Sequence, residues 1–481
     1  MATGRESLSE SKADSANAPS EGAGDGGEEQ RAASFLEKCA VFTMTFGPGC
    51  AVATYTTLFG WYQHVFHSSQ ALVWMRIALF APYPLIKMLQ QRYDAYFDEM
   101  FTVRSTYLFR VVIMQLVVAM LMLAWMFLPV SIADFASIIA FGAVLGCCCS
   151  PVIGSTMQIA IAIDPILSVW TQLGNFFGMA VPVIVVYASG FSSSSSHANF
   201  CKLVAFPMLI CILSFMWLGS LHYADVFSPA VLTITQRRTA RVSRLPEVEA
   251  NPQEEFNGVP SSDAEAAKLL NHADMDPNTS EMPRWVWFWL AANTLGLALD
   301  FFVLTLIGYF GTAQTTIHLA TGTLVCSVVG RLLTLPWRHL PAFEKGPMHI
   351  SGGIFFTARL CLWFALLLKL LKVWSPPFHT VLAVWCLWIV FANVFQGLTD
   401  LTVTANVSEA KKELAMQYIL IGTYSGLFVG MLTASILVLA SESSIQSQTP
   451  SAFLEGYQQI FRGHRNSKLF LEPAHLSSAS M

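Results

Sequence analysis

An arginine lies inside a strongly apolar stretch of the sequence, TLVCSVVGRLLTLPW at residues 323–337. A guanidinium near the centre of a membrane-spanning helix costs at least ~2.5–3.5 kcal/mol, so such a residue is expected to line a passage or to have a partner. Thr323, Ser327 and Arg331 recur at i, i+4 and i+8, which places them on one face of a helix. Arg331 can present several N–H donors to a carboxylate, a carbonyl or a hydroxyl group.

Two carboxylates lie well inside other apolar stretches, and each is a candidate partner for this arginine. Asp300 ends the run WFWLAANTLGLALD, and Asp400 belongs to a second polar stripe. That stripe recurs at i, i+3, i+7 and i+11 and consists of Asn393, Gln396, Asp400 and Thr404. Because the stripe gives its helix a continuous polar face, we predict that Asp400 pairs with Arg331, with Asp300 as the alternative.

Isolated polar side chains occur in the remaining apolar stretches, namely Asn293, Gln172, Asn175, Arg359, Ser155 and Gln158. Single Ser, Thr or Asn residues within spans usually hydrogen-bond a neighbouring helix, so packing is the favoured interpretation for them. An arginine and two aspartates within spans more often mark a pathway for a substrate or an ion. For those three we therefore favour a functional role.

The composition predicts what must position these side chains. The chain has 481 residues, of which 54% are hydrophobic and 12% are charged, which is far too apolar for a soluble domain. A membrane-spanning helix needs ~17–25 mostly apolar residues. We predict an all-α polytopic membrane protein with eleven spans, at residues 35–60, 69–89, 106–128, 134–155, 165–189, 202–222, 285–309, 315–336, 352–373, 379–404 and 416–440.

The placement of Lys and Arg predicts the orientation of these spans. Basic residues occur after the second, sixth, eighth and tenth spans, most densely in TQRRTARVSR at residues 235–244. The connections at 61–68, 129–133 and 310–314 contain neither Lys nor Arg. We therefore expect the N-terminus inside and the C-terminus outside.

The spans group into six and five around a polar linker, which is the usual layout of two-lobed transporters. We predict a disordered cytoplasmic tail (1–34), an N-terminal bundle (35–222), a largely unstructured cytoplasmic linker (223–284), a C-terminal bundle (285–440) and an extracellular tail (441–481). Glycines at four-residue spacing, Gly142 and Gly146 and then Gly422, Gly426 and Gly430, predict close helix contacts; a sliding surface is the alternative.

Several short motifs resemble the equilibrative nucleoside transporter family over residues 35–440. They are VGRLLTLPW in the eighth span, ARL in the ninth, FGAVLG in the fourth, TQLGNFFGMA in the fifth, and NVSEAKKELAMQYILIGTYSGLFVGM leading into the eleventh. The chain is similar to a divergent member of that family. The resemblance implies a two-lobed, major-facilitator-like fold in a 6+5 arrangement, with a central site for a nucleoside or nucleobase.

The sequence departs from the family pattern at three positions. Ser327 stands where the family has an Asp four residues before the arginine, Gly146 where it has a Gln that faces the base, and Thr54 where it has a Trp in the first span. Arg331 is retained while its acidic neighbour is not. These departures leave nucleobases, or another small polar solute, open as the substrate.

We predict that the protein transports nucleosides or nucleobases, purines above all, by alternating access.

 We expect the protein to be a carrier in the plasma membrane and not an enzyme. The predicted substrate-binding residues are Arg331, Ser327, Asp400, Gln396, Asn393, Asp300, Gln172 and Thr54. The expected partners are the small-molecule substrate and the lipid bilayer, with protons as a candidate coupling ion, and neither a cofactor nor a metal nor nucleic acid is expected.

Rival classes have weaker support in the sequence. The histidines of the predicted spans, His318, His349 and His379, lie near span ends and form no HExxH motif. The chain contains no GxxxxGK[ST] motif for ATP. A carrier of another small polar solute is the main alternative, and a channel is a lesser one, because no segment resembles a selectivity filter.

Overall fold

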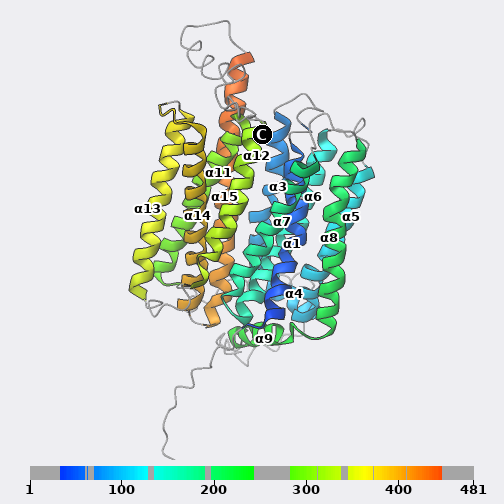
Figure 1. Ribbon diagram of the computed structural model, residues 1–481. Helices are drawn as coiled ribbons and strands as arrows, with labels where there is room; N and C mark the ends of the chain where they lie inside the picture. The colour runs from blue at the N-terminus through cyan, green and yellow to red at the C-terminus, as the bar shows by residue number, and fades with distance from the viewer. Residues whose placement is uncertain are drawn as a thin grey trace, which may run out of the picture. The chain divides into compact units, whose positions relative to one another are not determined.

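The computed structural model describes residues 33–59, 62, 70–127, 135–189, 197–242, 282–310, 313–336, 345–371, 373–407 and 409–446. These residues form long helices and, within the ranges given, no β-strand (Figure 1). The first half contains α1 (Phe35–Thr57), α3 (Gln70–Phe80), α4 (Pro82–Tyr107), the π-helix η1 (Leu108–Ile113), α5 (Met114–Phe127), α6 (Phe135–Ile163), α7 (Leu167–Ser189), α8 (His197–Tyr223) and α9 (Ser228–Val242). The second half contains α11 (Arg284–Phe310), α12 (Ala313–Leu332), α13 (Lys345–Leu370), α14 (Phe378–Asn406) and α15 (Glu409–Gln446).

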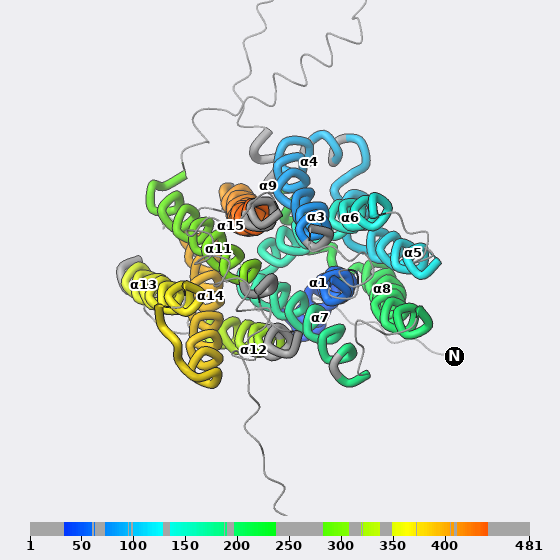
Figure 2. Tube along the Cα trace, turned by 90° about the horizontal axis from the view of Figure 1, so that it is seen from above, coloured from blue at the N-terminus to red at the C-terminus, as the bar shows by residue number. Residues whose placement is uncertain are grey.

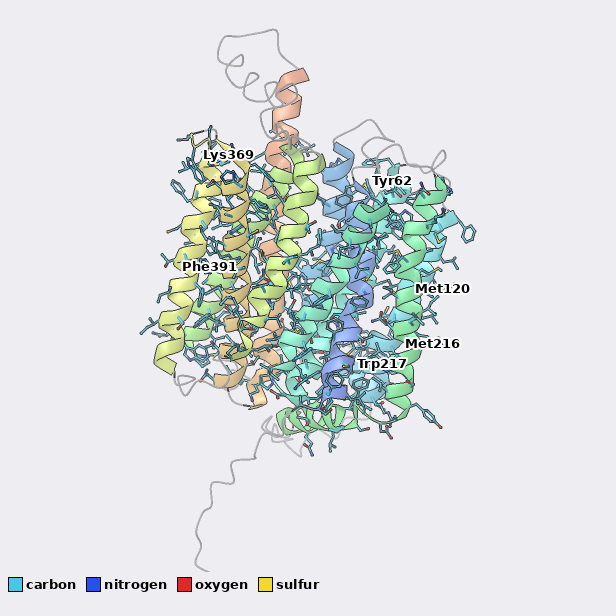
Figure 3. The ribbon with its side chains drawn as sticks, in the orientation of Figure 1. Tyr62, Met120, Met216, Trp217, Lys369 and Phe391 are labelled. Carbon is cyan, nitrogen blue, oxygen red and sulfur yellow. The ribbon has the colours of Figure 1, made fainter. Side chains whose placement is uncertain are left out.

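Within the described residues, eight helical segments are long and apolar enough to cross a membrane, and Thr321–Leu332 is a shorter apolar helix. The predicted first and second spans correspond to α1 and to α3 with the start of α4, which are not among the eight. The protein is thus an all-helical, multi-pass membrane protein, and the count of eleven spans stays a prediction. Large apolar side chains such as Met120 on α5 and Met216 on α8 are exposed on the helix surfaces, where hydrocarbon would solvate them (Figure 3).

Each half of the chain has its own main helix contacts. In the first half, α1 packs along α7, α5 packs along α8, and α6 packs against α3 and α4. In the second half, α11 packs along α15, and α14 packs against both α12 and α13. Contacts between the halves are made chiefly by α12 with α7 and by α15 with α4, as the view along the helices shows (Figure 2).

The close contacts predicted at the glycines of α15 are confirmed, and the partner is α11. A Cβ at Gly422 would lie 2.6 Å from Thr294 Oγ1, and one at Gly426 or Gly430 would meet the carbonyl oxygen of Thr294 or Ala298. The two backbones therefore approach as closely as glycine allows. In the first half, Gly142 and Gly146 leave room for the Tyr55 ring and for the backbone of α3.

The linker prediction is wrong for its first part. Residues 228–242 form α9, which packs against α4, α6 and α15 and lies across the lower ends of the other helices (Figure 1). This is the side predicted to face inward. Phe227, Ala230 and Ile234 are buried in an apolar cluster that includes Tyr107 and Ala160. Their spacing supplies an apolar face within a stretch whose overall composition is polar, so composition alone was misleading. Residues 243–281 lie outside the described residues, as do residues 1–32 of the predicted N-terminal tail (1–34) and residues 447–481 of the predicted C-terminal tail (441–481).

The connection after the second predicted span is also helical. Helix α4 runs from Pro82 to Tyr107, and Thr102, with a φ of 64°, interrupts it before the chain turns into η1. Lys87, near the end of the predicted second span, is only 4% exposed, and its ammonium donates to the carbonyl of Ser150 on α6. Arg92 is exposed on the same helix.

Candidate functional site

Arg331 lies in the last turn of α12, enclosed by neighbouring helices. Its Nη1 donates to Oδ2 of Asp400 on α14 at 2.9 Å, and the two side chains are 0% and 2% exposed. The predicted ion pair is therefore confirmed. Its role in binding a substrate stays a prediction.

Two further polar pairs join the same two helices. Nε1 of Trp385 donates to Oγ1 of Thr323 at 2.9 Å, and Nδ2 of Asn393 donates to Oγ of Ser327 at 3.1 Å. Residue numbers rise together from pair to pair, so α12 and α14 run parallel with their polar stripes facing each other. We call these pairs, together with Arg331–Asp400, the polar ladder.

Small residues hold the polar ladder together. A Cβ at Gly330 would lie 2.8 Å from the Asn393 Cβ and 2.8 Å from the Val390 carbonyl oxygen. A Cβ at Gly397 would lie 2.6 Å from Thr334 Cγ2. Glycine at these two positions lets the helices approach closely enough for short side chains such as Ser327 to reach across.

The guanidinium of Arg331 is only partly satisfied. Its Nε and Nη2 atoms have no hydrogen-bond partner among the described residues. The hydroxyls nearest in sequence serve the backbone instead: Thr334 donates to the Arg331 carbonyl and Thr404 donates to the Asp400 carbonyl, each at 2.6 Å. Because a buried donor without a partner is costly, this site is suited to an additional acceptor.

Asp300 is wrong as the alternative partner of Arg331. Its Oδ1 accepts from Nε of Arg359 on α13 at 3.1 Å and from Nε1 of Trp388 on α14 at 3.0 Å, and its Oδ2 accepts from Nη2 of Arg359. Gly296 leaves the space that the guanidinium fills, since a Cβ there would meet it. The sequence contained a signal for this pair, because Arg359 is itself a span arginine that needs a carboxylate.

The remaining predicted site residues are not joined to the polar ladder by any hydrogen bond that the described residues make. Gln396 on α14 and Gln172 on α7 are half-buried. Thr54 on α1 is fully buried, and its hydroxyl donates to the Cys50 carbonyl at 2.8 Å. The structure thus brings together Arg331, Asp400, Ser327 and Asn393, and leaves the other predicted residues apart.

Sequence reasoning missed a buried network on the side predicted to face inward. Oδ1 of Asp94 on α4 accepts from Nη1 of Arg110 in η1 at 2.6 Å, and Oδ2 accepts from Nε2 of Gln158 on α6 at 3.1 Å. The Tyr107 hydroxyl donates to Oε1 of Gln158 at 2.8 Å, and Nε2 of Gln417 on α15 lies 3.5 Å from Asp94 Oδ2. Asp94 fell within a predicted loop, where its charge carried no signal; Arg110 fell inside a predicted span and was a signal.

Two seams therefore join the halves near the side predicted to face inward. The α4–α15 seam combines Asp94 and Gln417 with the rings of Tyr83 and Tyr424, whose centroids lie 4.9 Å apart. The α7–α12 seam is apolar and is built around Val169. The other buried members of its cluster are Ile166, Leu173 and Leu401, and the partly buried Val328 and Leu335 pack against them. Among the described residues, both seams consist of noncovalent contacts.

Comparisons with known proteins agree with this arrangement. The sequence matches no protein-family model and no curated protein. A solved structure of the proton:xylose symporter XylE, bound to 6-bromo-6-deoxy-D-glucose, aligns with a TM-score of 0.54 at 13% identity, covering 85% of this chain and 89% of the symporter. An inward-open XylE from E. coli aligns with a TM-score of 0.51 at 14% identity, covering 84% and 90%.

The chain has the major facilitator fold. Identities of 13% and 14% establish the arrangement of helices and leave the substrate open. The nucleoside transporter NupG aligns with a TM-score of 0.45 at 14% identity over 84% of this chain and 91% of its own.

Proposed function

We propose that this protein carries a small polar solute across a membrane by alternating access, and that the solute is a nucleoside or a nucleobase, purines first. We further propose that this membrane is the plasma membrane. On this proposal the two halves, residues 35–222 and 285–440, move as bundles about a site between them.

The observation that carries the proposal is the state of Arg331. Its charge is compensated by Asp400, yet two of its donor atoms are buried without a partner among the described residues. A packing role alone would favour a fully bonded guanidinium, because each unsatisfied buried donor is costly. A solute carbonyl or hydroxyl would accept from these donors.

Access to Arg331 requires movement, because its side chain is 0% exposed. Helix α12 contributes both Arg331 and part of the α7–α12 seam. Opening that seam would therefore expose the helix end that carries the arginine. This coupling of site and seam is what alternating access needs.

The substrate class rests on the motifs shared with equilibrative nucleoside transporters, chiefly VGRLLTLPW around Arg331. Ser327 accepts a hydrogen bond from Asn393 and supplies no carboxylate to a ribose. A nucleobase needs no such acceptor, so hypoxanthine and adenine belong beside adenosine and inosine in the test.

Uptake of these four radiolabelled solutes into proteoliposomes that contain the purified protein tests the proposal. We expect saturable uptake of at least one, lost in Arg331→Ala and not restored by Arg331→Lys, because an ammonium lacks the planar fork of donors. Arg284→Gln, at an exposed arginine on the inner side, is the matched control and should transport normally.

The same assay separates the alternatives. Conductance that does not saturate with solute would indicate a channel. Absence of both uptake and binding for all four solutes would rule out the nucleoside proposal and leave another polar solute as the substrate. An inward proton gradient that accelerates uptake would identify protons as the coupling ion.

A further inference from the structure

A stripe of large apolar side chains runs along the exposed face of α4. Leu89, Tyr93, Tyr96 and Met100 recur at i, i+4, i+7 and i+11, so they share one face of the helix. With Phe97 and Phe101 beside them, each is 41–53% exposed. We call these six residues the α4 stripe.

The α4 stripe belongs to a helix that is firmly held on its other side. Lys87 and Asp94 are 4% exposed and project into the bundle, toward Ser150 and Arg110 respectively. The opposite face of α4 is therefore presented outward in a fixed orientation. The view along the helices shows α4 at the edge of the bundle (Figure 2).

The position of the α4 stripe along the helix matters for what covers it. The stripe extends past the end of the predicted second span at residue 89, on the inner side, and stops at the break in the helix at Thr102. Tyr residues gather where the hydrocarbon core of a bilayer meets its headgroups, because the ring is apolar and the hydroxyl is polar. A contiguous apolar patch of this kind is not expected to face water.

Basic groups flank the α4 stripe. Arg92 is exposed, and its guanidinium carbon lies 5.9 Å from the centroid of the Tyr93 ring. Arg104 is 51% exposed and is held in place by an ion pair with Asp225. Positive charge thus accompanies apolar surface at the level of the headgroups.

We propose that the α4 stripe and Arg92 form a binding surface for an anionic phospholipid of the inner leaflet. The aromatic and aliphatic side chains contact the upper acyl chains, and the guanidinium pairs with the headgroup phosphate or carboxylate. Charge complementarity and continuity with the lipid-facing part of α4 favour a lipid over a protein partner. This inference is independent of which solute is carried.

Thermal unfolding of the purified full-length protein in mixed micelles tests the proposal. Micelles containing phosphatidylserine should raise the midpoint of unfolding more than micelles containing phosphatidylcholine, and the extra rise should shrink at high salt because headgroup pairing is screened. Native mass spectrometry should show more retained phosphatidylserine than phosphatidylcholine.

Two variants and one control give the test its resolution. Arg92→Gln should lose most of the extra rise while keeping the response to phosphatidylcholine. Tyr93→Ala should weaken the response to both lipids. Arg284→Gln, at an exposed arginine on the same side but away from α4, should respond like the unmodified protein.

Several outcomes would overturn the proposal. These are an equal rise with both lipids, an unchanged response in Arg92→Gln, or a similar loss in the Arg284→Gln control. Inorganic phosphate at the same concentration should produce no rise, because it cannot contact the α4 stripe; if it did, the ligand would be a free anion and the lipid assignment would be wrong.

Discussion

At the scale of single residues, Arg331 and Asp400 form an ion pair, and removal of either side chain alone should destabilise the protein. Both side chains are buried, and the polar ladder around them offers no second carboxylate to the arginine among the described residues. Truncating one member of a buried ion pair leaves an uncompensated charge and costs ~3–5 kcal/mol in soluble proteins. Removing both leaves a cavity but no charge.

Arg331→Ala and Asp400→Ala should therefore each abolish uptake and sharply lower the yield of folded protein. The double variant should recover much of the folded yield and none of the uptake. Size-exclusion chromatography of detergent-solubilised protein measures the yield, and proteoliposome uptake measures transport. Strictly additive losses of yield would mean that the two charges are not coupled.

At the scale of helices, the contact between α11 and α15 leaves very little room for a larger side chain. Gly430 faces the carbonyl oxygen of Ala298 with no room for a side chain, whereas Gly353 on α13 has no heavy atom within 4 Å of where a Cβ would lie. The same substitution at these two glycines therefore separates packing from helix propensity.

Gly430→Leu should insert into the membrane but destabilise the protein by ~1–3 kcal/mol or more, the usual cost of overpacking, and reduce uptake. Gly353→Leu should retain full uptake and stability. The thermal midpoint and the uptake rate of the two variants check this. Normal uptake in Gly430→Leu would show that α11 and α15 separate more easily than their backbone contact implies.

The elements that the sequence predicts well are those with a strong period. The stripes of α12 and α14 were recognisable because polar residues repeat every three to four positions in an apolar background, and Arg331 and Asp400 follow from them. Helix α9 was missed because its apolar face rests on only a few residues, including Ala230 and Ile234. The partner of Asp300 depends on which helices become neighbours, which no local pattern encodes.

At the scale of the whole molecule, the proposed alternating access requires the two seams to open together. The α7–α12 seam buries Val169 completely, and the α4–α15 seam depends on Tyr83, Tyr424 and the Asp94–Gln417 contact. Weakening one seam should therefore loosen the other.

A cysteine at position 169 would report on this coupling. Val169→Cys should react slowly with a membrane-impermeant maleimide added from the inner side. Labelling of the unmodified protein, measured in parallel, is subtracted as background. Adding Tyr424→Ala and Gln417→Ala should accelerate the reaction several-fold, because the opposite seam is weakened. Unchanged labelling would mean that the seams open independently or not at all.

The buried ion pairs have an electrical consequence. Arg331 is matched by Asp400, Arg359 by Asp300, and Arg110 by Asp94, so each pair has no net charge. A unit charge moved across the whole field would gain or lose ~2.3 kcal/mol per 100 mV, but a neutral pair that shifts as a unit gains nothing. Uptake of an uncharged solute should then proceed at the same rate whether a potassium diffusion potential is inside-negative or zero. A rate that follows the voltage would mean that an ion crosses with the solute.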